Sequence, residues 1–147
     1  MIIRNMTQND TDAVIEMMKV FYASPAVLTN GSEDIFQNDV QSCIGDNPYL
    51  EGYLFAEDGN TAGYSMISKG FSTECGKSCI WIEDLYIKPE YRGKGFGTEF
   101  FSFIEQKYPD SVIKLEVEQE NQGAIHVYTN CGYEVLPYMI LKKNLTD

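Results

Sequence analysis

The chain has 147 residues, 44% of them hydrophobic and 22% charged, including 8 Phe, 10 Tyr and 1 Trp. This length and composition are typical of one folded domain, predicted over residues 1–147, and exclude a disordered or low-complexity chain. Eleven Lys and Arg against 22 Asp and Glu give a net charge of −11. Such a charge repels nucleic acid and anionic membrane surfaces and attracts cations. The composition therefore predicts no nucleic-acid partner and no membrane partner, and it favours a positively charged small molecule as substrate if the chain is an enzyme.

The four cysteines, Cys43, Cys75, Cys79 and Cys131, are too few for the disulfide framework of a small secreted chain. Cys75 and Cys79 together with His126, the single histidine, lack the close ligand spacing of zinc sites, so we predict no metal. The start of the chain has no basic stretch followed by an apolar run, which argues against a signal peptide. No segment reaches the ~18 uninterrupted apolar residues of a membrane span. We therefore expect reduced thiols and a cytoplasmic location.

The first third of the chain is predicted to form a short strand and two helices. Residues 2–4 have the apolar character of a strand, and Asp10 or Thr11 can cap the helix that follows. Apolar residues then recur at helical spacing, at Val14, Met17, Met18 and Phe21. Ser32 opens a second helix, which stops at Gly45. Its apolar side consists of Ile35, Phe36 and Val40.

The middle of the chain is predicted to form three strands. Residues 49–56 and 61–69 are rich in apolar and aromatic side chains, and residues 57–60 between them have the composition of a hairpin turn. A polar connection over residues 70–77 leads to the third strand, over residues 78–88. The hairpin turn predicts that the first two of these strands are antiparallel neighbours.

The last third of the chain is predicted to contain two helices and three strands. The first helix has its apolar side at Phe100, Phe101, Ile104 and Tyr108. Residues 111–118 alternate between apolar and charged side chains, the pattern of a strand. A short helix over residues 121–131 ends at Gly132, which can form a helix C-terminal cap. Residues 133–135 and 139–142 are predicted to be two closing strands. The order of elements predicts a single α+β domain, with a mixed, mostly antiparallel central sheet flanked by about four helices.

The segment between the third strand of the middle region and the next helix carries the most specific signal. Gly93, Gly95 and Gly97 allow a ligand to approach the backbone closely. The segment opens onto a helix N-terminus, where unpaired N–H groups and the helix dipole favour a phosphate or pyrophosphate. Arg92 and Lys94 add positive charge in an acidic chain. A plain tight turn is the alternative, but three glycines beside two cations favour an anion-binding turn.

Two common phosphate motifs do not fit this segment. A dinucleotide fingerprint needs a third glycine where the chain has Thr98, and a P-loop needs Ser or Thr directly after Lys94, where the chain has Gly95. Residue identity therefore argues against both.

Residues 92–97, Arg-Gly-Lys-Gly-Phe-Gly, are similar to the acetyl-coenzyme A loop of the GNAT family of N-acetyltransferases, written Gln/Arg-x-x-Gly-x-Gly/Ala. Residues 83–91 resemble that family's fourth strand and its exit. A second block of the family, Asn-x-x-Ala-x-x-x-Tyr-x-x-x-Gly-Phe/Tyr, is matched by Asn121, Ala124, Tyr128, Gly132 and Tyr133. The order of elements resembles the family over essentially the whole chain, except for residues 21–47, where acceptor recognition usually lies and the family varies most.

The resemblance implies acetyl-CoA as the cosubstrate and coenzyme A as a product. It implies that backbone groups of Leu85, Tyr86 and Ile87 pair with the pantetheine arm as an extra strand would. Asn121 would contact the cofactor near its reactive end. The pyrophosphate would be held by the segment of Arg92, Gly93, Lys94, Gly95, Phe96, Gly97 and Thr98.

The resemblance also implies that Tyr128 stands by the thioester sulfur as general acid. A tyrosine, with an ordinary pKa of ~10, can donate a proton to a leaving thiolate at neutral pH. On spacing alone Tyr128 would be a core aromatic, because it shares a helix face with Ala124, Val127 and Cys131. The motif match favours the catalytic interpretation.

The general base is predicted to be Glu83, with Asp84 as the alternative. Consecutive strand residues point to opposite faces, so we expect only one of the two to face the acceptor. Family members that resemble polyamine acetyltransferases have Glu at the first position. The next predicted strand carries a row of carboxylates, at Glu116, Glu118 and Glu120. This row either holds a cationic acceptor or forms a solvated face of the strand. His126 is expected to be a surface histidine.

Together these features predict an N-acetyltransferase that moves an acetyl group to a primary amine by direct attack in a ternary complex. Acidity favours a small polycation, such as a polyamine, as the acceptor. Polyamines, aminoglycosides, peptide N-termini and protein lysines all stay open. A non-catalytic module of the same fold that binds acyl-CoA is the alternative. Both a monomer and a homodimer stay open.

Overall fold

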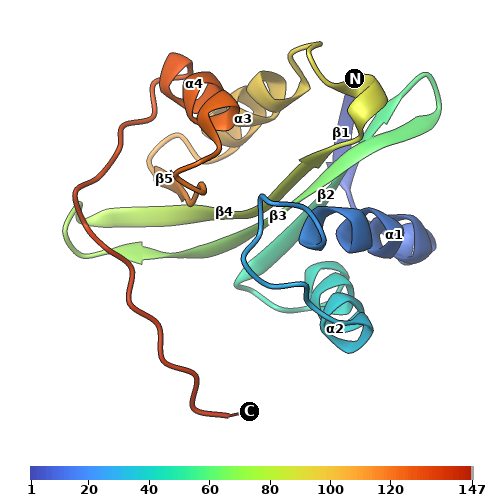
Figure 1. The fold of residues 1–147 in the computed structure, drawn as a ribbon, viewed down its shortest axis with the longest axis horizontal. Coiled ribbons are helices and arrows are strands. Elements are labelled where there is room, and N and C mark those ends of the chain that lie inside the picture. The colour runs from blue at the N-terminus through green and yellow to red at the C-terminus, as the bar shows by residue number, and fades with distance from the viewer. Residues whose placement is uncertain (147) are drawn as a thin grey trace.

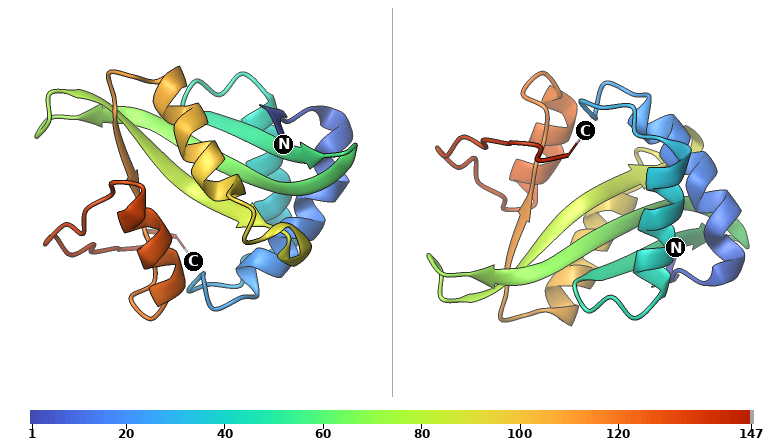
Figure 2. Two further views of the ribbon diagram at one scale, coloured as in Figure 1. Left: turned by 90° about the horizontal axis from the view of Figure 1, so that it is seen from above. Right: turned by 90° about the horizontal axis from the view of Figure 1, so that it is seen from below.

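The structure, a computed structural model, describes residues 1–146 and places helices on both faces of an open sheet (Figures 1 and 2). The strands, in spatial and chain order, are β1 (Ile2–Asn5), β2 (Leu50–Glu57), β3 (Asn60–Ser72), β4 (Lys77–Ile87) and β5 (Val112–Leu115). Neighbouring strands are antiparallel except β4 and β5, which are parallel. The helices are α1 (Thr11–Tyr22), α2 (Glu33–Ile44), α3 (Phe96–Lys107) and α4 (Gln122–Asn130). The predicted fold class is confirmed.

Helices α1 and α2 cover one face of the sheet, and α3 covers the other, with α4 beside it (Figure 2). The apolar side of α1 is buried as its spacing predicts, at Val14, Met17 and Met18. We call this face the α1 face. Its core includes Leu54, Tyr64, Met66 and Tyr86. The opposite face, which we call the α3 face, packs Phe100, Phe101 and Ile104 against Tyr53, Phe55, Ile67 and Ile82.

Of the two predicted helix caps, only Ser32 caps its helix through its side chain. Asp10 occupies the N-cap position of α1 without a side-chain cap hydrogen bond, and its carboxylate instead accepts from Arg4 at 2.7 and 2.9 Å, which ties the helix start to β1. The Ser32 hydroxyl accepts from the amide of Ile35 at 3.2 Å at the start of α2. The prediction that Ile35 belongs to the apolar side is wrong, because its side chain is exposed while Phe36 and Val40 are buried.

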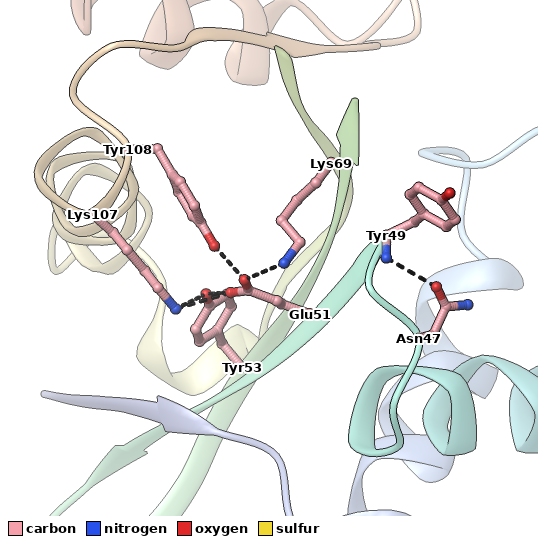
Figure 3. A network of polar contacts seen from close by, with 7 residues as sticks. All are labelled: Asn47, Tyr49, Glu51, Tyr53, Lys69, Lys107 and Tyr108. Carbon is pink, nitrogen blue, oxygen red and sulfur yellow. Dashed lines mark hydrogen bonds and ion pairs between the residues drawn. The ribbon is translucent and has the colours of Figure 1, made fainter. Parts of the chain in front are cut away.

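A polar cluster fastens the end of α3 to the sheet (Figure 3). The carboxylate of Glu51 on β2 accepts from Lys69 of β3 and Lys107 of α3, each at 2.9 Å, and from the hydroxyls of Tyr53 and Tyr108. Burial alone would raise the pKa of Glu51, but these hydrogen bonds outweigh it and lower the pKa to about 2. The cluster therefore fixes α3, whose opposite end begins at the glycine-rich segment.

The C-terminal part of the chain differs from the prediction. β5 ends at Leu115, so Glu116 and Glu118 do not lie on a strand. Residues 133–135 and 139–142 form no strands, and the predicted closing strands are wrong for this structure. Instead the chain leaves α4 and runs past the tip of the β3–β4 hairpin, away from the sheet (Figure 1). This C-terminal part therefore pairs with no strand of the sheet. Pro137, which lies between the two predicted strands, also lacks an N–H to donate to a neighbouring strand.

Candidate active site

The sheet opens beyond the middle of β4. β5 pairs only with Cys79–Ile82, so the rest of β4 has no neighbour on that edge within residues 1–146. The amide of Lys88 donates to Ala62 of β3 at 2.8 Å. Along an antiparallel strand, the residues alternate between those whose backbone N–H and C=O groups face the neighbouring strand and those whose groups face away. Since the backbone of Lys88 faces β3, Leu85 and Ile87 direct their N–H and C=O groups to the free edge. The backbone of Tyr86 faces β3 instead, and its side chain is buried in the α1 face.

The glycine-rich segment folds as an open cradle at the start of α3. Gly93 and Gly95 have φ angles of 75° and 82°, in the left-handed region that favours glycine. A Cβ built on Gly93, Gly95 or Gly97 would meet no atom within 4 Å. Gly95 is the N-cap residue of α3, so the first amides of the helix have no partner within the helix. This arrangement fits the pyrophosphate of a nucleotide cofactor, because the space is clear and the start of a helix leaves backbone N–H groups free there.

Arg92 and Lys94 rest on aromatic rings beside the cradle. The Arg92 Nε donates to the carbonyl of Ile87 at 2.8 Å, and its guanidinium lies 5.6 Å from the centre of the Tyr86 ring. The Lys94 Nζ lies 5.6 Å from the centre of the Tyr91 ring, which stacks on Phe96. Arg92 therefore links the free edge of β4 to the cradle, and both cations stay exposed.

A β-bulge interrupts β4 between the cradle and the hairpin. Met66 of β3 lies opposite Asp84, and Ile67 lies opposite Ile82, which leaves Glu83 as the extra residue. Ile82 belongs to the core of the α3 face, whereas Asp84 bonds to side chains of the α1 face. The bulge thus changes which residues of β4 point to which face.

Glu83 and Asp84 both point to the α1 face. The Ser68 hydroxyl, on that face of β3, donates to Glu83 Oε1 at 2.8 Å. Glu83 is also close enough to Asp39 of α2 that its charge, after burial, helps to raise the pKa of Asp39. The prediction that Glu83 and Asp84 point to opposite faces is therefore wrong, because a bulge breaks strict alternation.

The two carboxylates differ in exposure. Glu83 is exposed, whereas Asp84 is 3% exposed and accepts from the hydroxyls of Tyr64 at 2.7 Å and Tyr22 at 2.9 Å. Burial raises the pKa of Asp84 to about 6, with help from the charges of Asp39 and Glu83 and against the two hydrogen bonds. Asp39, Glu83 and Asp84, which we call the acidic cluster, bring three carboxyl groups close enough together that the charge of Glu83 helps to raise the pKa of Asp39 and of Asp84.

Tyr128 lies on α4 and packs edge-on against Phe101 of α3, with 5.6 Å between ring centres. Burial raises the pKa of Tyr128, so its hydroxyl keeps its proton at neutral pH. The hydroxyl has no hydrogen-bond partner within residues 1–146. Thr98 of α3 meets Cys131, which follows α4, at 3.6 Å, so the cradle and the end of α4 are in contact.

The remaining residues that the sequence singled out lie on α4, at its start or in the segment that precedes it. Asn121 caps α4, with its side-chain oxygen accepting from the amide of Ala124 at 3.2 Å. His126 is exposed and contacts Asn130, as expected of a surface histidine. Glu116 and Glu120 are exposed and do not line a strand face. Within residues 1–146, no group of three or more His, Cys, Asp or Glu could hold a metal ion.

Sequence reasoning missed Tyr22, Tyr64 and Asp39 as neighbours of the predicted base. They come from α1, β3 and α2, far from Glu83 in the chain, and no motif connects them. It also missed Tyr133, whose ring packs on Phe101 at 5.1 Å and whose hydroxyl is buried without a partner in the described residues. A spacing argument could not have found these contacts, because they depend on the fold.

Comparisons with known proteins agree with this geometry. The profile described as the Acetyltransferase (GNAT) family matches residues 15–133. The chain is 32% identical to the putative [ribosomal protein bS18]-alanine N-acetyltransferase of Bacillus subtilis (strain 168), over 99% of this chain and 87% of that one. It is 27% identical to thialysine N-epsilon-acetyltransferase of Sus scrofa, over 89% and 82% of the two chains. The crystal structure of a possible acetyltransferase from Clostridium difficile 630 shares the fold, with a TM-score of 0.84, 19% identity and coverage of 99% and 98%.

The chain therefore belongs to the GNAT family and is an N-acetyltransferase. Acetyl-CoA is the cosubstrate that fits this family, and the cradle at Gly93–Gly97 fits its pyrophosphate. None of the helices within residues 1–146 is long and apolar enough to cross a membrane.

Proposed function

We propose that this acetyltransferase acts, in the cytoplasm, on a small cationic primary amine such as a polyamine, which attacks directly in a ternary complex. The observation that carries the proposal is the acidic cluster on the α1 face, beside the free edge of β4. Asp39, Glu83 and Asp84 supply negative charge where an ammonium group would enter, and the net charge of −11 extends that field over the molecule. The similarity to a thialysine acetyltransferase points to the same class of acceptor.

The free edge of β4 and the cradle would together hold the cosubstrate. Leu85 offers its backbone N–H and C=O groups to the pantetheine arm, and Ile87 offers its N–H, in the way a strand pairs with an edge. The carbonyl of Ile87 already accepts from Arg92. The first amides of α3, with Gly93, Gly95 and Gly97 keeping the space clear, would bind the pyrophosphate. Bound acetyl-CoA supplies an activated acetyl thioester. The amide nitrogen of the Asn121 side chain stays available to it, because only the oxygen is used in the cap.

Glu83 would be the general base, acting directly or through a water. A primary ammonium has a pKa of ~10, like a lysine side chain, so almost none of it is nucleophilic at neutral pH. Glu83 is the exposed member of the acidic cluster and can accept the proton as attack begins. Asp84 has both oxygens engaged by Tyr22 and Tyr64, so it would orient the site and attract the cation without exchanging the proton.

Tyr128 would be the general acid. Its raised pKa keeps the proton on the hydroxyl, and no other group of the described chain occupies that hydroxyl. As the carbon–sulfur bond breaks, the hydroxyl can donate its proton to the thiolate.

A panel of amines, assayed by release of coenzyme A thiol, tests the proposal. The panel should include a polyamine, a lysine-like side-chain amine, an aminoglycoside and a peptide with a free N-terminus. We expect the polyamine to give the highest kcat/KM, and its KM to rise with ionic strength, because salt screens exposed charges. Preference for the peptide would favour an activity like that of the bS18-alanine relative. Binding of coenzyme A without turnover of any amine would contradict the proposed reaction.

A further inference from the structure

Trp81, the single tryptophan of the chain, belongs to neither hydrophobic core of the described residues. It lies on β4 opposite Ser68 of β3, and the side chains on either side of it, Ile80 and Ile82, are part of the core of the α3 face. Because side chains alternate along this regular part of the strand, the Trp81 side chain points to the α1 face. The residue is partly exposed there, so its ring is accessible to a ligand.

An ammonium group already rests on this ring. Lys114 of β5 pairs with Trp81 in the parallel ladder, and its Nζ lies 5.7 Å from the centre of the Trp81 ring. Within residues 1–146 this Nζ forms no ion pair, although the chain has 22 Asp and Glu. The ring therefore holds a cation without a carboxylate, by attraction between the ammonium and the face of the indole.

The Trp81 ring and the proposed base share a neighbour. The Ser68 hydroxyl donates to Glu83 Oε1 at 2.8 Å, and Ser68 is also the cross-strand partner of Trp81. Trp81 and Glu83 are thus close together on the α1 face of β4. An acceptor whose reacting amine stands at Glu83 has the ring beside the rest of its chain.

We propose that the Trp81 ring binds the second ammonium group of an acceptor with two or more amines, in a place that the Lys114 ammonium occupies in the free protein. This inference rests on the proposed reaction with a small polyamine, and it adds the contact that distinguishes such an acceptor from a monoamine. The long, flexible stem of Lys114 allows its head group to turn to solvent when the acceptor binds. Because one ammonium replaces the other, Lys114 competes with the acceptor and weakens its binding.

Fluorescence of Trp81 tests the contact directly, because no other tryptophan contributes to the emission. The protein is titrated with spermidine, a triamine, and separately with butylamine, a monoamine, in the presence of coenzyme A, which allows no turnover. We expect spermidine to change the emission with saturation, and butylamine at equal ionic strength to leave it unchanged. In Lys114→Met the dissociation constant of spermidine should fall about two- to fivefold, the size of an exposed cation–π contact.

Lys77→Met is the matched control for this charge change. Lys77 is an exposed lysine at the start of β4, without an ion pair in the described residues, and its removal adds the same net charge to the molecule. Its spermidine titration should follow the wild type. Equal gains in Lys77→Met and Lys114→Met would show that only the overall field changed, which overturns the proposal.

Steady-state kinetics provides a second measurement. Trp81→Leu, with an unchanged circular dichroism spectrum, should raise the KM for spermidine about two- to fivefold and keep kcat, because the ring binds a part of the acceptor that does not react. In the Trp81→Leu background, Lys114→Met should no longer lower this KM. An equal decrease in both backgrounds would overturn the proposal.

The two measurements separate this inference from the proposed reaction. Turnover of spermidine with no change in the Trp81 emission would overturn the ring contact and leave the acetyl transfer to a polyamine standing. Saturable quenching by spermidine without turnover of any amine would support the ring contact and contradict the proposed reaction. Weaker binding of spermidine to Lys114→Met than to the wild type would show that Lys114 does not compete, which also overturns the proposal.

Discussion

Glu83 and Asp84 are consecutive residues of β4, and their side chains lie on the same face of the sheet. The bulge at Glu83 makes this arrangement, since Met66 faces Asp84 while Ile67 faces Ile82. One carboxylate is exposed and bonded to Ser68, and the other is buried under two tyrosine hydroxyls. The bulge therefore gives the site two carboxylates with different surroundings, one exposed to solvent and one buried.

Glu83→Gln should lower kcat/KM for the best amine by about 100-fold at neutral pH, the size of a general-base contribution. Raising the pH should recover part of the loss, because more of the amine is then deprotonated in solution. The measurement is a pH profile of kcat/KM for the variant and the wild type. Glu90→Gln, at an exposed carboxylate that follows β4, is the control and should keep the wild-type profile. If the pH profiles of kcat/KM for Glu83→Gln and the wild type coincide, Glu83 has no part in the mechanism.

The local elements and the cradle could be predicted from the sequence, because each depends on neighbouring residues. Val14, Met17 and Met18 follow the helical period and are buried as expected. Gly93 and Gly95 have the positive φ angles that a glycine-rich turn before a helix suggests. The family motifs then place these elements in one known arrangement, and the sheet order agrees with it.

The bulge, the surroundings of Glu83 and the C-terminal part of the chain could not be predicted in this way. Strict alternation along β4 assumes a regular ladder, and nothing in the residues around Glu83 indicates the extra residue. Tyr22 and Asp39 reach Asp84 only through the packing of α1 and α2 on the sheet. Residues 139–142 have a strand pattern, but a strand needs an edge to pair with, and the pattern does not identify that edge.

Gly95→Val should abolish coenzyme A binding while the protein stays folded. The new side chain would enter the cradle, and valine is disfavoured at a φ of 82°. Isothermal titration calorimetry with coenzyme A measures the effect. Gly76→Val is the matched control, because Gly76 has a φ of 67° and equally open surroundings but lies at the tip of the β3–β4 hairpin. It carries similar backbone strain and should bind coenzyme A normally. Wild-type affinity in folded Gly95→Val would contradict a pyrophosphate site at the cradle.

Tyr128→Phe should lower kcat by about 100-fold, because it removes the proposed proton donor, and should leave coenzyme A affinity unchanged. Tyr133→Phe is the matched control, since both rings pack on Phe101. The Tyr133 hydroxyl is buried without a partner, so its removal should keep activity and should not lower the melting temperature. The measurements are steady-state kinetics and thermal unfolding of the two variants. Equal kcat in both variants and the wild type would mean that Tyr128 only packs.

Glu51→Gln should lower the free energy of unfolding at neutral pH. It should also make that free energy depend less on pH between pH 4.5 and pH 2. The native pKa of Glu51 is about 2, below its ordinary value of 4.5, so the native state binds the proton less readily than the unfolded chain. The stability from this carboxylate is therefore complete above pH 4.5 and is lost as the pH falls toward 2. Lys69 and Lys107 are partly exposed, so screening reduces the contribution to about 1–2 kcal/mol.

Guanidinium unfolding of Glu51→Gln and the wild type, followed by circular dichroism from pH 2 to pH 7, measures this contribution. The two free energies of unfolding should differ most at neutral pH and converge as the pH approaches 2, because the wild-type carboxylate is then protonated as well. Asp110→Asn, at an exposed turn residue after α3, is the control and should follow the wild-type curve. The outcome that contradicts the prediction is a difference in the free energy of unfolding that stays constant from pH 2 to pH 7. In that case shape and packing, not charge, would explain how Glu51 holds Lys107 and Tyr108 at the end of α3 against the sheet.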